Sequence, residues 1–308
     1  MLLQSSTAVA IMVSNFVSGG SIAAAVGLAI LLGADVDSAL VAQVLLVRQT
    51  FLVPLLLLLG VGLFLRGQQR RVRQTGRILI GLALIFVSLD MIRAATAPLV
   101  GSVGAGSVMQ YLGSNLRTAF LIGAFFAWVV HSSVAAVLLF VTLVSQGLLP
   151  QSAAVAMVLG ANLGGAMIAY LLTLSAPIEA RRMIVANLVL RGGGAVLLLA
   201  VLAIFAPPLS WIGATEARQV INLHLCFNLG LALIAMPVVS PVTRLFESML
   251  AARSSGGSGV GLSALDPSAL ESPDRALSCA AREIFRMGET IEAMLRSANG
   301  LFSRWDPT

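Results

Sequence analysis

Two short polar motifs in an otherwise apolar chain contain the residue types needed to bind an anion. Gln4-Ser5-Ser6-Thr7 lies near the start of the sequence, and His131-Ser132-Ser133 lies 127 positions further on. Each Ser pair opens an apolar stretch that predicts a short helix, and the first turn of a helix offers unpaired N–H groups and the positive end of its dipole. Serine hydroxyls add donors for the same anion. Two such helix ends facing each other would hold a tetrahedral oxyanion, whereas a single pair would more simply bond back to its own helix.

The two motifs open two copies of one longer unit. Residues 4–45 align without a gap on residues 131–172, and about a third of the aligned positions are identical. Breaks at Gly19-Gly20 and Gly33-Ala34-Asp35 in the first copy have counterparts in the second, the later one at Gly160-Ala161-Asn162. The pieces between breaks, about 12 to 15 residues, are too short for about 30 Å of hydrocarbon, which predicts re-entrant hairpins or broken helices. Ordinary spans with glycines at close helix contacts are the alternative.

Composition places the chain in a membrane. Of its 308 residues, 58% are hydrophobic and 10% are charged, which is too apolar for a soluble domain. All 19 basic residues are Arg, and the net charge of +6 is concentrated at residues 66–77 and in the C-terminal region. We interpret this charge as membrane topology, not as a nucleic-acid-binding surface. The predicted fold class is an all-α polytopic protein embedded in the lipid bilayer of the cell membrane (bacterial inner membrane).

The Arg clusters also predict the orientation of the two copies. With Arg66–Arg77 and Arg181–Arg182 on the cytoplasmic side, the apolar segment 78–92 runs outward. The second copy then begins outside and ends inside, while the first begins inside and ends outside. Two inverted repeats around a site near the membrane midplane are typical of secondary transporters.

The chain is expected to divide into six consecutive parts: the first repeat (1–50), connecting spans with a basic cytoplasmic loop (51–115), the second repeat (116–183), terminal spans (184–245), a linker (246–273) and a cytoplasmic helical region (274–308). The first repeat lacks the leading helix of the second, and we interpret it as N-terminally incomplete. Apolar residues between Leu277 and Phe302 recur at alternating spacings of three and four, which predicts an amphipathic helix. Because one such helix cannot bury its own seam, we expect it to pack on a cytoplasmic helical partner or on another copy of the chain.

Asp35 and Asn162 occupy the same position in the two copies, at the second break of each. Their side-chain oxygens, together with unwound backbone carbonyls, would suit a sodium ion, because a hard cation prefers oxygen ligands. A close helix contact at the neighbouring glycines is the equally weighted alternative.

Other ionisable residues also lie in or near the apolar spans, where a functional role is the first hypothesis. His131 directly precedes the second Ser pair and is expected to line its site. Asp90 and Arg93 are three residues apart and are expected to form a local pair. Arg191 could attract an anion, although a structural role is favoured, and His224 is expected to pack between helices.

These residues give the chain a resemblance to the type II sodium–phosphate cotransporters. Gln4-Ser5-Ser6-Thr7 is similar to the Gln-Ser-Ser-Ser signature of that family, and Gly160-Ala161-Asn162-Leu163-Gly164 resembles its Gly-x-Asn-Ile-Gly element. The resemblance covers roughly residues 4–240. It implies movement of inorganic phosphate driven by sodium, with these substrate-binding residues: Gln4, Ser5, Ser6, Thr7, His131, Ser132 and Ser133. It also implies sodium near Asp35 and Asn162, and the region 274–308 resembles the start of the PhoU-like cytoplasmic domain of bacterial members.

The chain departs from this pattern at Asp35-Val36-Asp37-Ser38, where the family has Asn-Ile-Gly-Thr. Two carboxylates near an anion weaken its binding unless they are protonated or bound to a cation. The departure therefore favours obligatory coupling to sodium or protons, or a changed substrate.

The expected function is sodium-coupled transport of inorganic phosphate by alternating access, in either direction. We expect no enzymatic activity and no cofactor apart from sodium as the coupling ion. The alternative is a non-transporting membrane scaffold for phosphate signalling. A second alternative, an intramembrane serine hydrolase, would use Ser132 or Ser133 with His131 or His224. It is disfavoured because His131 and Ser132 are adjacent and face different ways on a helix, and because the sequence has no Gly-x-Ser-x-Gly motif.

Overall fold

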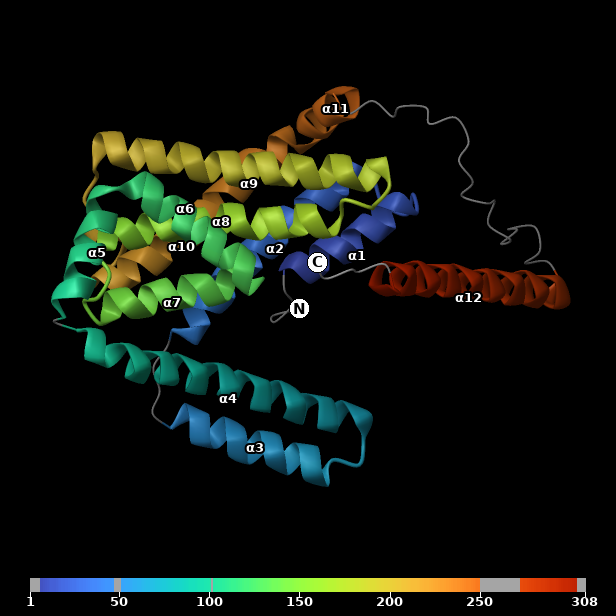
Figure 1. Cartoon of the computed structure of the whole chain (residues 1–308), viewed down its shortest axis with the longest axis horizontal. Coiled ribbons are helices and arrows are strands. Elements are labelled where there is room, and N and C mark those ends of the chain that lie inside the picture. Colours follow the sequence, from blue (N-terminus) through green and yellow to red (C-terminus); the bar gives the residue numbers. More distant parts are fainter. Residues whose placement is uncertain (1–5, 47–50, 101, 250–271, 304–308) are drawn as a thin grey trace. The chain divides into compact units, whose positions relative to one another are not determined.

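The computed structural model describes residues 6–46, 51–100, 102–249 and 272–303. These described residues form helices and the turns that connect them (Figure 1), which confirms the all-α fold class. The chain divides into two units, Met1–Ala251 and Ala252–Thr308. Gln4 and Ser5 of the first motif lie outside the described residues, as does nearly all of the expected linker.

The first unit contains eleven α-helices and three short 3-10 helices within its described residues. In chain order these are α1 (Ser6–Ser18), α2 (Ala24–Leu45), α3 (Leu52–Arg66), α4 (Arg70–Thr96), η1 (Ala97–Leu99), α5 (Val103–Ser114), α6 (Leu116–Val130), α7 (Ser133–Ser145), α8 (Gln151–Leu172), α9 (Ile178–Phe205), η2 (Leu209–Ile212), α10 (Glu216–Ala235), η3 (Met236–Val238) and α11 (Val239–Met249).

The duplicated unit folds in the same way twice. Helices α1 and α7 have 13 residues each, and α2 and α8 have 22 each. Corresponding helices begin and end at residues that correspond in the sequence alignment. The short helix of each copy is followed by a glycine with φ of +69°, Gly20 in the first and Gly147 in the second. Glycine adopts this left-handed conformation without the penalty of a Cβ. The first predicted break is therefore confirmed in both copies, while their inversion stays a prediction.

The second predicted break is wrong in both copies. Gly33-Ala34-Asp35 lies within the continuous helix α2, and Gly160-Ala161-Asn162 within the continuous helix α8. In α8 the glycines permit close packing: a Cβ on Gly160 would collide with the carbonyl oxygen of Phe120 in α6, and one on Gly164 with that of Ala124. The glycine contact is thus the correct interpretation for α8, and the backbone carbonyls there are part of a regular helix.

Five of the described helices are long and apolar enough to cross a membrane, or six if the bent pair α5–α6 counts as one span. Helix α5, although rich in Gly and Ser, is a regular helix that meets α6 at 107°. Helix α3, at 15 residues, is among the shorter apolar helices. The basic residues expected in a loop before the next span lie largely on the first turns of α4. This arrangement fits a multi-pass protein of the inner membrane.

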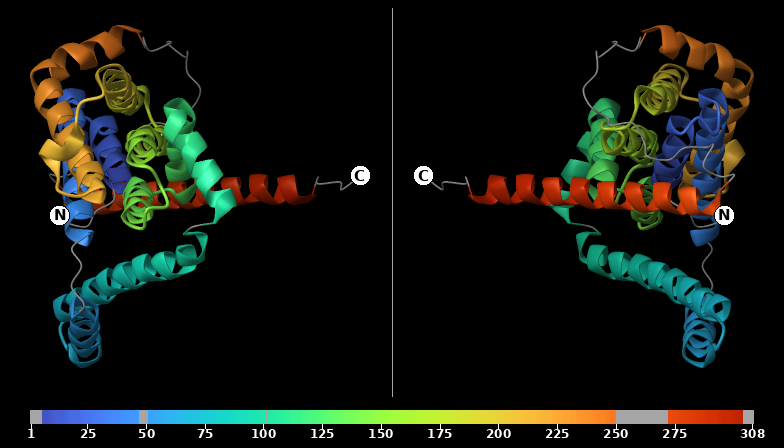
Figure 2. Two further views of the ribbon diagram at one scale, coloured as in Figure 1. Left: turned by 90° about the vertical axis from the view of Figure 1, so that its left-hand side faces the viewer. Right: turned by 90° about the vertical axis from the view of Figure 1, so that its right-hand side faces the viewer.

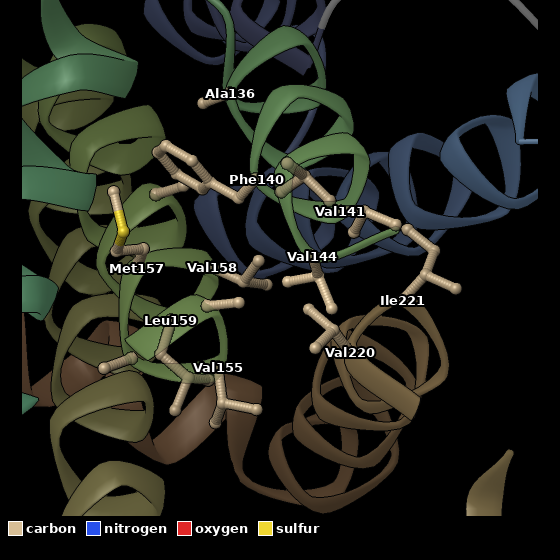
Figure 3. Packing of buried hydrophobic residues seen from close by; sticks show 14 of the residues in the cluster. Ala136, Phe140, Val141, Val144, Val155, Met157, Val158, Leu159, Val220 and Ile221 are labelled. Carbon is tan, nitrogen blue, oxygen red and sulfur yellow. The ribbon is translucent and has the colours of Figure 1, made fainter. Parts of the chain in front are cut away.

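Helix α8 lies at the centre of the first unit, enclosed by the other helices (Figure 2). Figure 3 shows the core around it, where Val144 of α7 lies near Val158 of α8, and Val141 of α7 lies near Ile221 of α10. All four side chains are buried. The two copies thus share one apolar core with α9 and α10, and the polar residues described below are embedded in it.

Helices α3 and α4 form an antiparallel hairpin joined by a tight turn (Figure 1). Gly60 and Gly76 allow their backbones to approach closely. The expected pair of Asp90 and Arg93 is confirmed, with Arg93 Nη1 donating to Asp90 Oδ1 at 2.7 Å. The C-terminal end of α4 contacts α7 through Gln146, whose Nε2 donates to the carbonyl of Arg93 at 2.9 Å.

The second unit contains α12 (Pro273–Ser303), which confirms the expected long helix after the linker. Its apolar residues Leu277, Ile284, Ile291 and Leu295 are exposed. The predicted partner for this seam and the likeness to PhoU stay predictions.

The contrast between Gly160 and Gly33, which occupy the same position in the two copies, is directly testable. We expect Gly160→Ala to destabilise the protein by about 1–3 kcal/mol, because overpacking forces α6 and α8 apart. Gly33→Ala is the matched control, since a Cβ there meets nothing within 4 Å and alanine favours a helix by about 1 kcal/mol. Thermal unfolding in detergent measures both, and an equal response of the two variants would contradict the packing role.

Candidate functional site

A buried arginine in the middle of α9 joins the two copies of the repeat. The Arg191 side chain has 3% of its surface exposed, and its Nη1 donates to Asp35 Oδ1 of α2 at 2.6 Å. Its Nη2 and Nε donate to Asn162 Oδ1 of α8, at 3.2 and 3.4 Å. Asp35 and Asn162 are both buried. One guanidinium therefore links three helices inside an apolar bundle.

The two partners of Arg191 are equivalent residues. Asp35 in α2 and Asn162 in α8 occupy the same position in the two copies of the repeat. The sequence predicted both residues as sodium ligands, and the structure brings both to the side chain of Arg191. Each copy thus contributes one oxygen-bearing side chain to Arg191, and only the first contributes a negative charge.

The first Ser-containing motif reaches the same place through the N-terminal end of α1. Ser6 and Thr7 line a small cavity together with Asp35 and Arg191. The other residues lining it are Ala10, Leu31, Gly165, Ala166, Ala169 and Asn187. Two hydroxyls at a helix N-terminus therefore lie beside the buried ion pair.

The second motif reaches Arg191 from α7. Ser133, the first residue of α7, is buried. A Cβ placed on Gly165 would lie 3.3 Å from Ser133 Oγ and 3.6 Å from Arg191 Nη1. Ser133 and Arg191 therefore approach the same glycine, whose missing side chain leaves room for both. Ser132 has a different role: its Oγ accepts from the N–H of Ala135 at 3.1 Å and caps α7.

His131 lies outside this arrangement. It ends α6 with φ of 55°, its side chain is exposed, and Nδ1 lies 3.0 Å from the carbonyl oxygen of Val129. A residue in this left-handed position turns the chain from α6 into α7, which places the imidazole away from the cavity.

A second polar cluster adjoins Asn162. The Nδ2 of Asn162 donates to the carbonyl of Val158 at 2.9 Å and lies 3.2 Å from His224 Nδ1. Asn228 Nδ2 lies 3.3 Å from the same nitrogen. Both amide nitrogens face Nδ1, and a hydrogen bond from either of them makes Nδ1 the acceptor nitrogen of the ring. His224 is thus a buried packing histidine, as expected, and it fixes the Asn162 side chain with its oxygen toward Arg191.

This set of groups can bind an anion in exchange for the Asp35 carboxylate. A guanidinium pairs well with carboxylates and phosphates because its N–H groups form a planar fork. The N-terminal ends of α1 and α7 add partial positive charge and hydroxyl donors. In the structure Asp35 takes the position on Arg191 that an external anion would need.

A family assignment follows from comparison with known proteins. Residues 1–94 and 100–240 match the model of a family described as Na+/Pi-cotransporter. The chain belongs to the Na+/Pi-cotransporter family. This membership confirms the resemblance predicted from the two motifs, and it accords with an integral membrane protein of several spans. The family is a transporter family, which is consistent with the expectation of no enzymatic activity.

Several bacterial proteins are similar to this Na+/Pi-cotransporter family member. The "Putative inorganic phosphate export protein YjbB" of Escherichia coli K12 is 36% identical over 298 residues, covering 97% of this chain and 55% of that protein. Its namesake in Salmonella typhimurium is 34% identical, covering 96% and 54%. "Uncharacterized protein YqeW" of Bacillus subtilis is 25% identical over 252 residues, covering 82% of each. The chain spans about half the length of the YjbB proteins. No solved structure matches.

Sequence reasoning did not find Asn187 and did not foresee the partners of Arg191. Arg191 was recognised as ionisable, but spacing could not show that it pairs with a residue 156 positions away. Asn187 lies in no motif, and nothing in the sequence distinguishes it from an ordinary helix-packing amide.

The buried pair predicts a specific pattern of stability. We expect Asp35→Leu and Arg191→Leu each to destabilise the protein by about 3–5 kcal/mol, because each leaves one buried charge unpaired. The double variant should recover most of this loss, since it removes both charges. Unfolding in detergent measures all three. Asp90→Asn, on an exposed pair, is the control and should cost about 1 kcal/mol or less. Additive losses in the double variant would contradict the pairing.

Proposed function

We propose that this chain moves inorganic phosphate across the membrane by alternating access, coupled to sodium. The observation that supports this most strongly is the buried Arg191, next to which the N-terminal ends of both repeats supply hydroxyl groups. A charge inside an apolar bundle is costly and is usually functional in a membrane protein. Family membership supports phosphate as the substrate.

In the proposed mechanism phosphate replaces Asp35 Oδ1 on the guanidinium of Arg191. The hydroxyls of Ser6, Thr7 and Ser133 would donate to the remaining phosphate oxygens, and the N–H groups at the start of α1 and α7 would face the same anion. Ser132 would hold the first turn of α7 in shape. Gln4 and Ser5 belong to the same binding motif by sequence. His131 does not line the cavity in the described conformation, so we propose that it lines the cavity only in other conformations of the transport cycle.

Alternation between the two sides requires helices to move around a common site. Arg191 donates hydrogen bonds to one helix from each copy, α2 and α8. When phosphate replaces Asp35 on Arg191, the positive charge of the guanidinium stays balanced by a negative charge. Helix α2 then loses its ion pair to α9. Movement of α2 relative to α8 and α9 is therefore the proposed opening step.

The direction of transport follows the gradients in such a mechanism. An inward sodium gradient would drive uptake, while a high internal phosphate concentration would drive export through the same site. The YjbB proteins carry export in their name, so we propose export as a physiological direction. Of the two predicted sodium ligands, Asn162 has its oxygen engaged by Arg191, which leaves Asp35 as the better candidate.

Flux of radiolabelled phosphate in proteoliposomes, with a sodium or a choline gradient, tests the proposal. We expect sodium-dependent flux in the wild type and its loss in Arg191→Met. Ser133→Ala should lower the flux about tenfold or more, because a hydrogen bond to a charged ligand contributes about 1.5–3 kcal/mol. Ser88→Ala is the control, because this exposed hydroxyl on α4 bonds only to its own helix, at the carbonyl of Leu84.

The result that would reject the proposal is a reconstituted, folded protein without phosphate flux in either direction. That outcome would favour the scaffold alternative. Flux that persists in Arg191→Met would keep transport but remove the proposed site. Flux without sodium dependence would reject the coupling and leave the phosphate site standing.

A further inference from the structure

The cavity beside Arg191 contains two buried oxygen atoms that the anion site does not use. Asp35 Oδ2 and Asn187 Oδ1 have no hydrogen-bond partner among the described residues. Both residues line the cavity, and both are 4% exposed. A buried acceptor without a partner costs about 1–3 kcal/mol. Two of them in one cavity require an explanation.

The chemistry of these atoms indicates the ligand. A carboxylate oxygen and an amide oxygen only accept hydrogen bonds, and the hydroxyls of Ser6 and Thr7 on the same cavity can each turn a lone pair inward. Such a set of oxygens suits a hard cation. The residues that line the cavity come from α1, α2, α8 and α9, so a cation held there would contact helices of both repeats.

We propose that Asp35 Oδ2, Asn187 Oδ1 and the Thr7 hydroxyl bind a sodium ion in this cavity. The proposal rests on the transport function above and assigns its coupling ion to particular atoms. Asn187 is the new ligand. It replaces Asn162, whose oxygen accepts two N–H groups of Arg191 and whose amide nitrogen donates to Val158.

Asp35 makes this cation site and the phosphate site depend on one another. Its Oδ1 holds Arg191, and its Oδ2 would hold sodium. Sodium on Oδ2 competes with Arg191 for the charge of one carboxylate, so the guanidinium becomes more available to phosphate. Arg191 also lines the cavity, and its repulsion of sodium decreases once phosphate neutralises it. By linkage, each ion must then raise the affinity of the other by the same factor.

Sodium binding can be measured without phosphate. The full chain in lipid nanodiscs would be unfolded thermally in choline chloride with increasing sodium chloride at constant ionic strength. A ligand that binds only the folded state stabilises it by RT ln(1 + [L]/Kd), so the unfolding temperature rises with the logarithm of the ligand concentration above Kd. We expect this rise with sodium in the wild type. Asn187→Leu should weaken the apparent sodium affinity at least about tenfold, equivalent to 1.4 kcal/mol.

Two further variants separate a ligand from a packing residue. Asn187→Asp keeps the size and adds a charge, so it should bind sodium as tightly as the wild type or more tightly. Ser14→Ala is the control, because this buried serine of α1 also has an oxygen without a partner among the described residues but does not line the cavity. Its sodium response should equal that of the wild type. Thr7→Val provides an independent loss variant if Asn187→Leu does not fold.

The proposal is overturned if sodium does not stabilise the wild type, or if Asn187→Leu and Thr7→Val respond like the wild type. A sodium response that Asn187→Asp loses would overturn it as well, because a carboxylate is the stronger sodium ligand. Phosphate flux of the same protein reconstituted into proteoliposomes distinguishes the two failures. Flux without a sodium response rejects this cation site alone, whereas a sodium response without flux rejects the transport function and leaves the cation site in place.

Discussion

The guanidinium of Arg191 is a positive charge inside an apolar helix bundle, and a neighbouring negative charge must balance it. Removing one partner of a buried pair costs about 3–5 kcal/mol, so the surrounding residues are arranged to avoid that state. Asp35 supplies the charge, and Asn162 supplies a second acceptor whose orientation is fixed by Val158 and His224. In the proposed mechanism an external anion reaches Arg191 by taking over the role of Asp35, and the stabilising contact then becomes a binding site.

Duplication explains why the site lies where it does. The equal lengths of α1 and α7, and of α2 and α8, show that both copies kept one backbone plan. Equivalent positions of the two copies then meet at the side chain of a third helix, α9. The copies have diverged at the contact itself, with a carboxylate in one and an amide in the other. That asymmetry gives the site one removable negative charge, and in our account sodium and phosphate both act on it.

Much of the fold follows from the sequence because its signals are local. A repeated turn glycine, such as Gly20 and Gly147, marks the end of a helix through its own backbone conformation. Gly33 and Gly160 also predicted helix breaks, and this prediction was wrong. A glycine inside a helix can instead allow a neighbouring backbone to approach, as Gly160 does for Phe120. The site could be predicted in part: Ser6, Thr7, Ser133, Asp35 and Asn162 were expected and lie together. Arg191 and Asn187 join them through tertiary packing, which produces no periodic pattern in the sequence. His131 lies outside this group in the structure, because it occupies the turn between α6 and α7 and its side chain is exposed.

Phosphate binding by Asp35→Asn in sodium-free medium tests the competition between Asp35 and phosphate most directly. The variant keeps the shape of the side chain and removes its charge, so Arg191 is available to phosphate without displacement of a carboxylate. Equilibrium binding of radiolabelled phosphate to folded protein should be at least about tenfold tighter than in the wild type, a difference of 1.4 kcal/mol, and it should no longer respond to sodium. Binding that is unchanged or weaker in Asp35→Asn would contradict the account.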